Sequence, residues 1–381
     1  MDTHISKTSR IELSRHLAKR GHEVYFIAAR SRERCRSKNV RFHIVPIPLR
    51  YVPVISPMFY GLTVFFFLPF YAIWKRPDFI VTDPLTLVYV FLWKPLLSRF
   101  IRTRAILDIR TTPVGTFGFR GFLYTLQFNI SVQLAKTLFD GITIITPAMK
   151  EQICSAFNID SESIGVRSDA ASTELFTCEK NVDYGFELRE KFGLSKKLIL
   201  FYHGSILKSR GIVESVEAVT ILKKKYPDVV LFILGGGVDV SFLKNAIREL
   251  GAQDAVVMHG TVDYEDVPKY IAMSDVGLVP LPDIPDWRNQ CPLKLLEYLA
   301  MKRTVILTDI PANRNIVGQE KCGIYVPSCD PAEIAKAMEF AYKNREKLEE
   351  WGESGRKIIE QEYNWDKKAK DMEDYLKKVR S

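Results

Sequence analysis

Residues 274–309 place a helix between two short apolar strands, and this order constrains the fold more than any other feature of the chain. Residues 274–281 (SDVGLVPL) and 304–309 (TVILTD) have the β-branched composition of buried strands. A helix that joins two such strands is typical of a crossover between parallel strands. The amino terminus of the helix then lies at the carboxyl edge of the sheet, where open α/β sheets bind ligands.

This helix opens with Pro292 and carries Glu297 one turn further on. A proline in the first helical position leaves the amides of Leu293 and Lys294 free to contact an anion at the positive end of the helix dipole. A carboxylate one turn later can accept hydrogen bonds from both hydroxyls of a ribose. The pattern favours a nucleotide site, although an ordinary amphipathic helix with a solvated glutamate shares it.

Strands and helices alternate along the rest of the chain. In the first half we expect a helix at residues 5–20, strands at 22–28, 40–47, 79–82 and 104–109, a helix at 122–138 and a strand at 141–146. In the second half we expect strands at residues 198–203, 229–234, 255–259 and 323–326, and helices at 211–225, 240–250, 266–273 and 331–342. This order predicts an α/β protein made of two Rossmann-like domains that face a cleft.

A polar, weakly periodic segment at residues 167–183 separates the two halves. We therefore expect an N-terminal domain at residues 1–175 and a C-terminal domain at residues 184–362. The charged helix at the end of the chain, within residues 363–381, is expected to pack back toward the N-terminal domain.

The composition, with 47% hydrophobic and 26% charged residues among 381, is typical of a globular protein of two α/β domains. The six cysteines form no C-x-x-C pair and the six histidines lack metal-ligand spacing, so we expect reduced thiols, no metal and no cofactor. The polar opening MDTHISKTSR does not resemble a signal peptide. We therefore expect a cytoplasmic location.

Positive charge is concentrated in the first half of the chain. Residues 1–175 hold 23 Lys and Arg against 13 Asp and Glu, whereas residues 176–381 hold 31 against 32. The densest basic run comprises Arg30, Arg32, Arg34, Arg36, Lys38 and Arg41. It fits a solvated loop or a surface for anionic lipid, and because no aromatic residues are interleaved with it, it is a poor match to a nucleic-acid site.

Two strongly apolar segments follow that run. Residues 51–74 contain no charge and are long enough to cross a bilayer, but three prolines and a glycine interrupt them. Residues 85–100 contain only two charges. These segments fit three interpretations: a core helix with a membrane-touching face, a plain core helix, and a transmembrane segment. Peripheral attachment to the cytoplasmic face of the membrane is the working interpretation.

Glycine-bearing turns follow two strands of the second half. The turn at residues 203–211 (HGSILKSRG) can approach a ligand closely at Gly204, and Arg210 can fork onto a diphosphate. A plain loop fits that turn equally well. Residues 259–262 (HGTV) end another strand at the same edge, where exposed backbone could pair with a nucleobase.

With these segments in order, residues 3–378 resemble the retaining glycosyltransferases of family 4, which have the GT-B fold. The resemblance rests on five segments: RGHEV (20–24), HGSILKSRG (203–211), HGTVDYEDVPKYIAMSDVGLVP (259–280), PLKLLEYLAMKRTVILTDIP (292–311) and YNWDKKAKDMEDYL (363–376). It implies that the second domain binds a nucleotide-diphosphate sugar without a metal and that the first domain binds the acceptor.

The resemblance also implies roles for single residues. Glu297 is similar to the second glutamate of the family's E-x7-E motif, which holds the ribose. Arg210 stands where the family usually has a diphosphate-binding lysine. The other donor-binding positions implied by the resemblance are Gly204, Ser205, Thr261, Val262, Pro292, Leu293 and Lys294. Thr261 and Val262 match the base-contacting turn, and the amides of Leu293 and Lys294 match those that meet the distal phosphate.

Four departures from the family pattern concern catalysis and the start of the chain. Asn289 stands where the first glutamate of E-x7-E is expected, and Ser205 stands where an arginine is common. Arg110 replaces a histidine near the reacting sugar, so the catalytic set implied by the resemblance is Arg110, Asn289 and Arg210. The family begins with a strand before the helix that ends in RGHEV, so we expect the first domain to lack that strand.

The resemblance therefore implies a retaining glycosyltransferase, and the apolar, basic first half favours a lipid-linked or cell-envelope glycan, including a polysaccharide, as its acceptor at an anionic membrane surface. Two alternatives remain: a nucleotide-sugar 2-epimerase of the same fold, and a non-catalytic protein that binds nucleotide sugars. A nucleic-acid partner is not expected.

Overall fold

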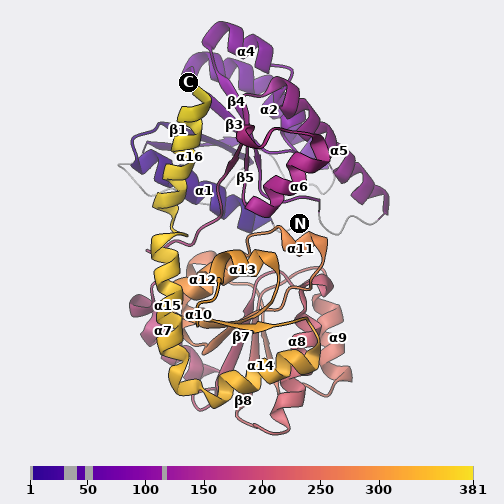
Figure 1. Cartoon of the computed structure of the whole chain (residues 1–381), viewed down its shortest axis with the longest axis vertical. Coiled ribbons are helices and arrows are strands. Elements are labelled where there is room, and N and C mark those ends of the chain that lie inside the picture. The colour runs from indigo at the N-terminus through magenta and orange to yellow at the C-terminus, as the bar shows by residue number, and fades with distance from the viewer. Residues whose placement is uncertain (1–2, 30–40, 48–54, 114–117, 381) are drawn as a thin grey trace. The chain divides into compact units, whose positions relative to one another are not determined.

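A computed structural model of the chain describes residues 3–29, 41–47, 55–113 and 118–380. The chain divides into two compact units, both drawn in Figure 1. Residues 4–168 and 365–381 form one unit, which we call the N-terminal unit. Residues 169–364 form the other, which we call the C-terminal unit.

The N-terminal unit contains two parallel sheets. One sheet pairs β1 (Val24–Ala29) with β2 (Phe42–Ile47), and the other has the order β3 (Phe79–Thr82), β4 (Arg104–Ile109), β5 (Gly141–Ile144) and β6 (Ile164–Val166). Among the described residues, no strand joins the two sheets. Helix α2 (Ile55–Lys75) connects them through a small core, in which its Val64 and Leu68 pack against Ile47 of β2 and Ile80 of β3.

The remaining helices of this unit are α1 (Thr3–Lys19), α3 (Leu87–Val90), α4 (Lys94–Ile101), α5 (Gly118–Leu138), α6 (Pro147–Phe157) and the last helix of the chain, α16 (Trp365–Arg380). The hydroxyl of Tyr375 on α16 donates to the carbonyl oxygen of Ser163 at 2.7 Å and accepts from the amide of Ile142 at 2.9 Å. An ion pair at 2.6 Å joins Arg20 to Glu373. These contacts hold α16 on the unit that is built from the first half of the chain.

The C-terminal unit contains one sheet of six parallel strands. Their order is β12 (Gly323–Val326), β11 (Thr304–Thr308), β10 (Val276–Val279), β7 (Leu198–His203), β8 (Val229–Leu234) and β9 (Val256–His259). The predicted α/β class with parallel sheets is therefore confirmed in both units.

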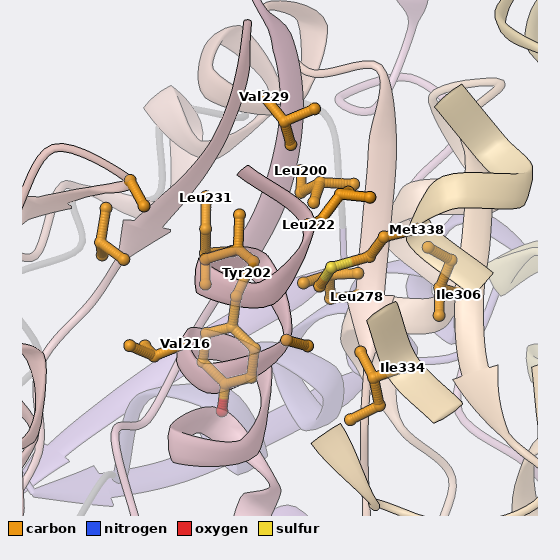
Figure 2. Packing of buried hydrophobic residues seen from close by; sticks show 14 of the residues in the cluster. Leu200, Tyr202, Val216, Leu222, Val229, Leu231, Leu278, Ile306, Ile334 and Met338 are labelled. Atoms are coloured by element: carbon orange, nitrogen blue, oxygen red, sulfur yellow. The ribbon is translucent and has the colours of Figure 1, made fainter. Parts of the chain in front are cut away.

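Helices cover both faces of this sheet. They are α7 (Cys178–Lys191), α8 (Ile212–Lys223), α9 (Val240–Glu249), α10 (Val267–Ala272), α11 (Pro285–Arg288), α12 (Leu293–Ala300), α13 (Pro311–Val317), α14 (Pro331–Lys343) and α15 (Leu348–Gln361). Successive residues of β7 face opposite sides, as the pleat requires. Leu200 and Tyr202 enter the core formed with α8 and α14 (Figure 2), whereas the rings of Phe201 and His203 contact Tyr298 of α12.

The strand order places a ligand-binding edge next to β7. The chain leaves β7 toward β8 and β9, and then returns to the opposite side of β7 as β10. At such a reversal, the connections that leave the carboxyl ends of the two strands diverge and open a crevice between them. The turns after β7 and β10 therefore form the floor of a site within this unit.

Each predicted strand and helix is observed, with differences at its ends, and the structure adds elements that were not predicted, namely α6, β6, α7, α11, α13 and α15. One difference at an element's end concerns the predicted site. Pro292 was expected in the first helical position, but its φ of −72° and ψ of 103° are extended, so this prediction is wrong by one residue. Pro292 is instead the N-cap, and its carbonyl oxygen accepts from the amide of Leu295 at 2.9 Å. Leu293 and Lys294 consequently provide the first two amides of α12.

The apolar segments form separate helices rather than one span. Residues 55–75 form α2, with Pro69 inside it, and residues 85–100 divide between α3 and α4. In the part of the chain that the structure describes, no helix combines the length and the apolar character needed to cross a bilayer. Within the predicted basic run, residues 30–40 lie outside the described residues.

Candidate functional site

Two glycine turns meet at the carboxyl ends of β7 and β8. Gly204 follows β7 with a φ of 112°, and Gly235 follows β8 with a φ of 148°. A Cβ atom on Gly235 would lie 2.0 Å from the carbonyl oxygen of Gly204, which is far inside van der Waals contact. The amide of Ile206 also donates to the carbonyl oxygen of Gly236 at 2.8 Å. The two turns thus present a surface of backbone atoms at the strand ends.

The turn after β7 closes against the end of β10. Gly211 has a φ of 68°, and a Cβ atom there would lie 1.8 Å from the carbonyl oxygen of Pro280. Only glycine allows this approach of two backbones. The contact fixes Arg210 beside the loop that leads from β10 to α12.

Lys294 is a buried cation without a hydrogen-bond partner among the described residues. Its side chain sits in the first turn of α12, where backbone amides have no partner within the helix, and only 8% of the residue is exposed. The ammonium nitrogen lies 3.5 Å from the centre of the Tyr202 ring. Burial and the nearby charge of Arg210 lower the pKa of Lys294 well below its usual range.

Arg210 is the second cation at this edge. Its guanidinium carbon lies 5.0 Å from the centre of the Trp287 ring, and its Nε is buried without a hydrogen-bond partner. Within the described part of the chain, neither Arg210 nor Lys294 forms an ion pair with a carboxylate closer than 4 Å. The charge of Arg210 is near enough to act on Lys294 in the first turn of α12, and two such cations can hold a doubly charged group such as a diphosphate.

Glu297 lies one turn further along α12 and is only 4% exposed. The Tyr264 hydroxyl donates to its Oε1 at 2.8 Å, and Nε2 of His203 lies 3.3 Å from its Oε2. Burial raises the pKa of Glu297 to about 7, although Tyr264 and Lys294 act in the opposite direction. Burial, with Lys294, also lowers the pKa of His203 well below its usual range, so the ring is neutral. The carboxylate can exchange these contacts for the hydroxyls of a diol.

The turn after β9 lies beside the glycine turns. Thr261 is exposed and Val262 is half-buried, and a Cβ atom on Gly236 would lie 3.0 Å from Cγ2 of Thr261. Ser205 is buried, and its carbonyl oxygen accepts from the Tyr202 hydroxyl at 3.0 Å. The predicted donor residues from three strand ends and from α12 therefore lie along one edge of the C-terminal unit.

The other two predicted catalytic residues, Asn289 and Arg110, lie in different units of the structure. Asn289 is the C-cap residue of α11, half-buried on the loop between β10 and α12. Arg110 follows β4 in the N-terminal unit, where it is buried near Asp108. Burial raises the pKa of Asp108, but the charges of Arg167, Arg110 and Arg10 outweigh it and hold this pKa at about 2. Of the three predicted catalytic residues, Asn289 and Arg210 thus belong to the C-terminal unit and Arg110 to the N-terminal unit.

Sequence reasoning did not assign four residues that shape this site: Tyr202, His203, Tyr264 and Trp287. His203 begins the turn at residues 203–211 and Tyr264 lies two residues after the turn at 259–262, so their positions were a usable signal. Tyr202 and Trp287 contact cations that are far away in the sequence, so no local sequence pattern predicted these contacts. The described residues contain no cluster of three or more His, Cys, Asp or Glu side chains that could hold a metal ion.

Comparison with known families identifies the chain. The model for Glycosyltransferase Family 4 matches residues 8–168, and the model for Glycosyl transferases group 1 matches residues 186–358. The chain belongs to glycosyltransferase family 4. The second match covers every donor-site residue of the C-terminal unit described above.

Curated relatives in this glycosyltransferase family are distant. Alpha-D-kanosaminyltransferase of Streptomyces kanamyceticus is 25% identical over 47% of this chain and 45% of its own length. A glycosyltransferase of Methanocaldococcus jannaschii is 23% identical over 72% of this chain and 69% of its own. A GDP-mannose-dependent alpha-(1-6)-phosphatidylinositol monomannoside mannosyltransferase of Mycobacterium tuberculosis is 22% identical over 62% of each chain. The chain thus spans about half the length of the first of these relatives.

Solved structures extend the likeness over the whole chain. A glycosyltransferase from Rickettsia africae has a TM-score of 0.77 at 13% identity and covers 100% of this chain and 96% of its own. HepE of Anabaena, solved with UDP and glucose, has a TM-score of 0.74 at 12% identity and covers 98% of this chain and 96% of its own. At such low identity the likeness shows the fold, and it confirms the predicted GT-B class.

Proposed function

We propose that the protein is a retaining glycosyltransferase that moves a sugar from a nucleotide-diphosphate sugar to a lipid-linked or cell-envelope glycan. The observation that carries this proposal is the pair of neighbouring cations Lys294 and Arg210 beside the start of α12, where Lys294 Nζ and Arg210 Nε are buried without a hydrogen-bond partner among the described residues. Glu297 lies one turn away and supplies the carboxylate that a ribose requires. Anabaena HepE, which shares the fold, was solved with UDP and glucose.

The proposed mechanism depends on charge in the transition state. As the bond between the sugar and the diphosphate breaks, negative charge gathers on the leaving diphosphate. Arg210, Lys294 and the first amides of α12 are in position before the reaction begins, and they stabilise this charge as it develops. Such preorganised electrostatic stabilisation is usually the largest contribution to lowering a reaction barrier. Asn289 hydrogen-bonds hydroxyls of the transferred sugar.

An apolar face of the N-terminal unit supports a membrane-bound acceptor. Helix α2 exposes Phe66, Phe70 and Trp74, the last two at 76% and 71%, and α5 exposes Phe119, Phe122, Leu123, Leu126 and Ile130 at helical spacing. Arg76 and Arg99 are exposed next to these helices. Exposed aromatic residues with basic neighbours suit the headgroup region of an anionic membrane. We therefore propose that the protein binds the cytoplasmic face of a membrane. The mycobacterial relative is named for a phosphatidylinositol mannoside acceptor.

Release of nucleoside diphosphate tests the transfer. We expect the protein, supplied with UDP-glucose or GDP-mannose, to release UDP or GDP much faster when cell membranes are present. A sugar nucleotide converted to its epimer in the absence of membranes would instead favour a 2-epimerase. Tight binding of a sugar nucleotide without release in any membrane extract would favour a non-catalytic protein.

Vesicle binding tests the apolar face. We expect the double variant Phe70→Ser/Trp74→Ser to bind vesicles of phosphatidylcholine and phosphatidylglycerol roughly 30-fold more weakly in co-sedimentation, since each side chain contributes on the order of 1 kcal/mol of apolar burial. Phe186→Ser is the matched control, because Phe186 is also an exposed phenylalanine, 64% accessible, but lies on α7 of the C-terminal unit. Equal binding by wild type and the double variant would show that this face does not contact lipid.

A further inference from the structure

Trp287 connects two loops of the site. It lies on α11, between β10 and α12, and it is only 6% exposed. Its Nε1 donates to the carbonyl oxygen of Ser209 at 2.7 Å. The indole therefore reaches across to the turn after β7 and holds the residue that precedes Arg210.

The ring of Trp287 also holds the guanidinium group itself. The guanidinium carbon of Arg210 lies 5.0 Å from the ring centre, within the range of a cation–π contact. Among the described residues, Arg210 forms no ion pair with a carboxylate, and its buried Nε has no hydrogen-bond partner. An acidic side chain in the place of Trp287 would orient Arg210 but would neutralise it. The aromatic ring orients Arg210 and leaves its charge available to an anion.

We propose that Trp287 is a positioning residue that holds Arg210 toward the diphosphate of the donor. The inference rests on the proposed role of Arg210 as a diphosphate ligand. Asn289 lies two residues after Trp287 and caps the same short helix, so the residue proposed to contact the sugar and the residue that holds Arg210 belong to one segment. Displacement of this loop would therefore disturb the diphosphate contact and the sugar contact together.

A double-mutant cycle tests this role by calorimetric binding of UDP and of GDP to the full-length protein. Trp287→Leu should weaken binding of the nucleotide that wild type prefers by about 3- to 30-fold, the range expected for a lost cation–π contact and its hydrogen bond. In an Arg210→Ala background the same change should have less than a twofold effect. Trp287→Phe, which keeps a ring but loses the Nε1–H donor, should fall between wild type and Trp287→Leu.

Trp351→Leu is the matched control. Trp351 packs on Phe340 of the same unit, so this substitution removes an indole ring from a position outside the site. It should leave nucleotide binding unchanged. Equal weakening by Trp287→Leu in both backgrounds would show that Trp287 only supports the fold, and no weakening in the wild-type background would also overturn the role. A wild-type protein that binds neither UDP nor GDP would overturn the proposed function itself, and this role with it.

Discussion

Lys294→Met is expected to make the unliganded protein more stable and to remove most of its activity. The ammonium group of Lys294 is buried without a hydrogen-bond partner among the described residues, and burial together with Arg210 lowers its pKa well below the usual range. An unsatisfied buried polar or charged group costs about 1 to 3 kcal/mol, and methionine fills a similar volume without it. The same cation is the one that would meet the leaving diphosphate.

The two effects are measured separately. We expect Tm to rise by about 3 °C or more, and kcat/KM for the sugar nucleotide to fall roughly 100- to 1,000-fold, as for the loss of one preorganised donor to a developing anion. Lys191→Met is the control, since Lys191 is exposed and lies near the ring of Phe192 rather than in the site. A variant that loses stability and keeps its turnover would contradict both the burial argument and the phosphate role of Lys294.

Glu297→Gln is expected to stabilise the unliganded protein at alkaline pH and to weaken binding of the donor nucleotide. Burial raises the pKa of Glu297 from 4.5 to about 7 in the folded chain. The folded state therefore binds the proton more tightly than the unfolded state does. The resulting stabilisation is complete below about pH 4.5 and is lost as pH rises through 7. A shift of this size corresponds to on the order of 3 kcal/mol.

Glutamine has no proton to lose and can still accept from Tyr264. The difference in Tm between Glu297→Gln and wild type should therefore grow in favour of the variant between pH 5 and pH 8. Binding of UDP or GDP at pH 8 should weaken about 10- to 100-fold, because a neutral amide replaces a charged acceptor for the ribose hydroxyls. Glu249→Gln, on an exposed position of α9, is the control. A pH-independent difference in Tm would show that Glu297 does not titrate in this range.

Most strands and several helices of the C-terminal unit could be predicted from the sequence, because buried parallel strands are continuous apolar runs and their connecting helices begin with recognisable turns. The predicted strand at residues 198–203 coincides with β7, and α12 carries Lys294 and Glu297 on its first two turns as expected. The position of Pro292 was wrong by one residue, since a proline fits both the N-cap and the first helical position and composition does not distinguish them.

The N-terminal unit was harder to predict. Its apolar segments at residues 51–74 and 85–100 satisfied the patterns of a core helix, a surface helix and a membrane span at once. The structure shows three helices, α2, α3 and α4, with part of their apolar surface exposed. Hydropathy measures the character of a helix but does not say which of its faces another element covers.

The sequence alone determined the class of fold, the order of the strand ends, and the cations and carboxylate proposed to bind the donor, because each of these depends on periodicity or on residue type at a turn. Only the tertiary structure decided what those groups face. Tyr202 lies under Lys294, Trp287 lies against Arg210, and His203 lies beside Glu297. These pairs join residues that are 77 to 94 positions apart. The burial that shifts the pKa values of Lys294, His203 and Glu297 exists only once the strands and the helix that carry these residues lie side by side.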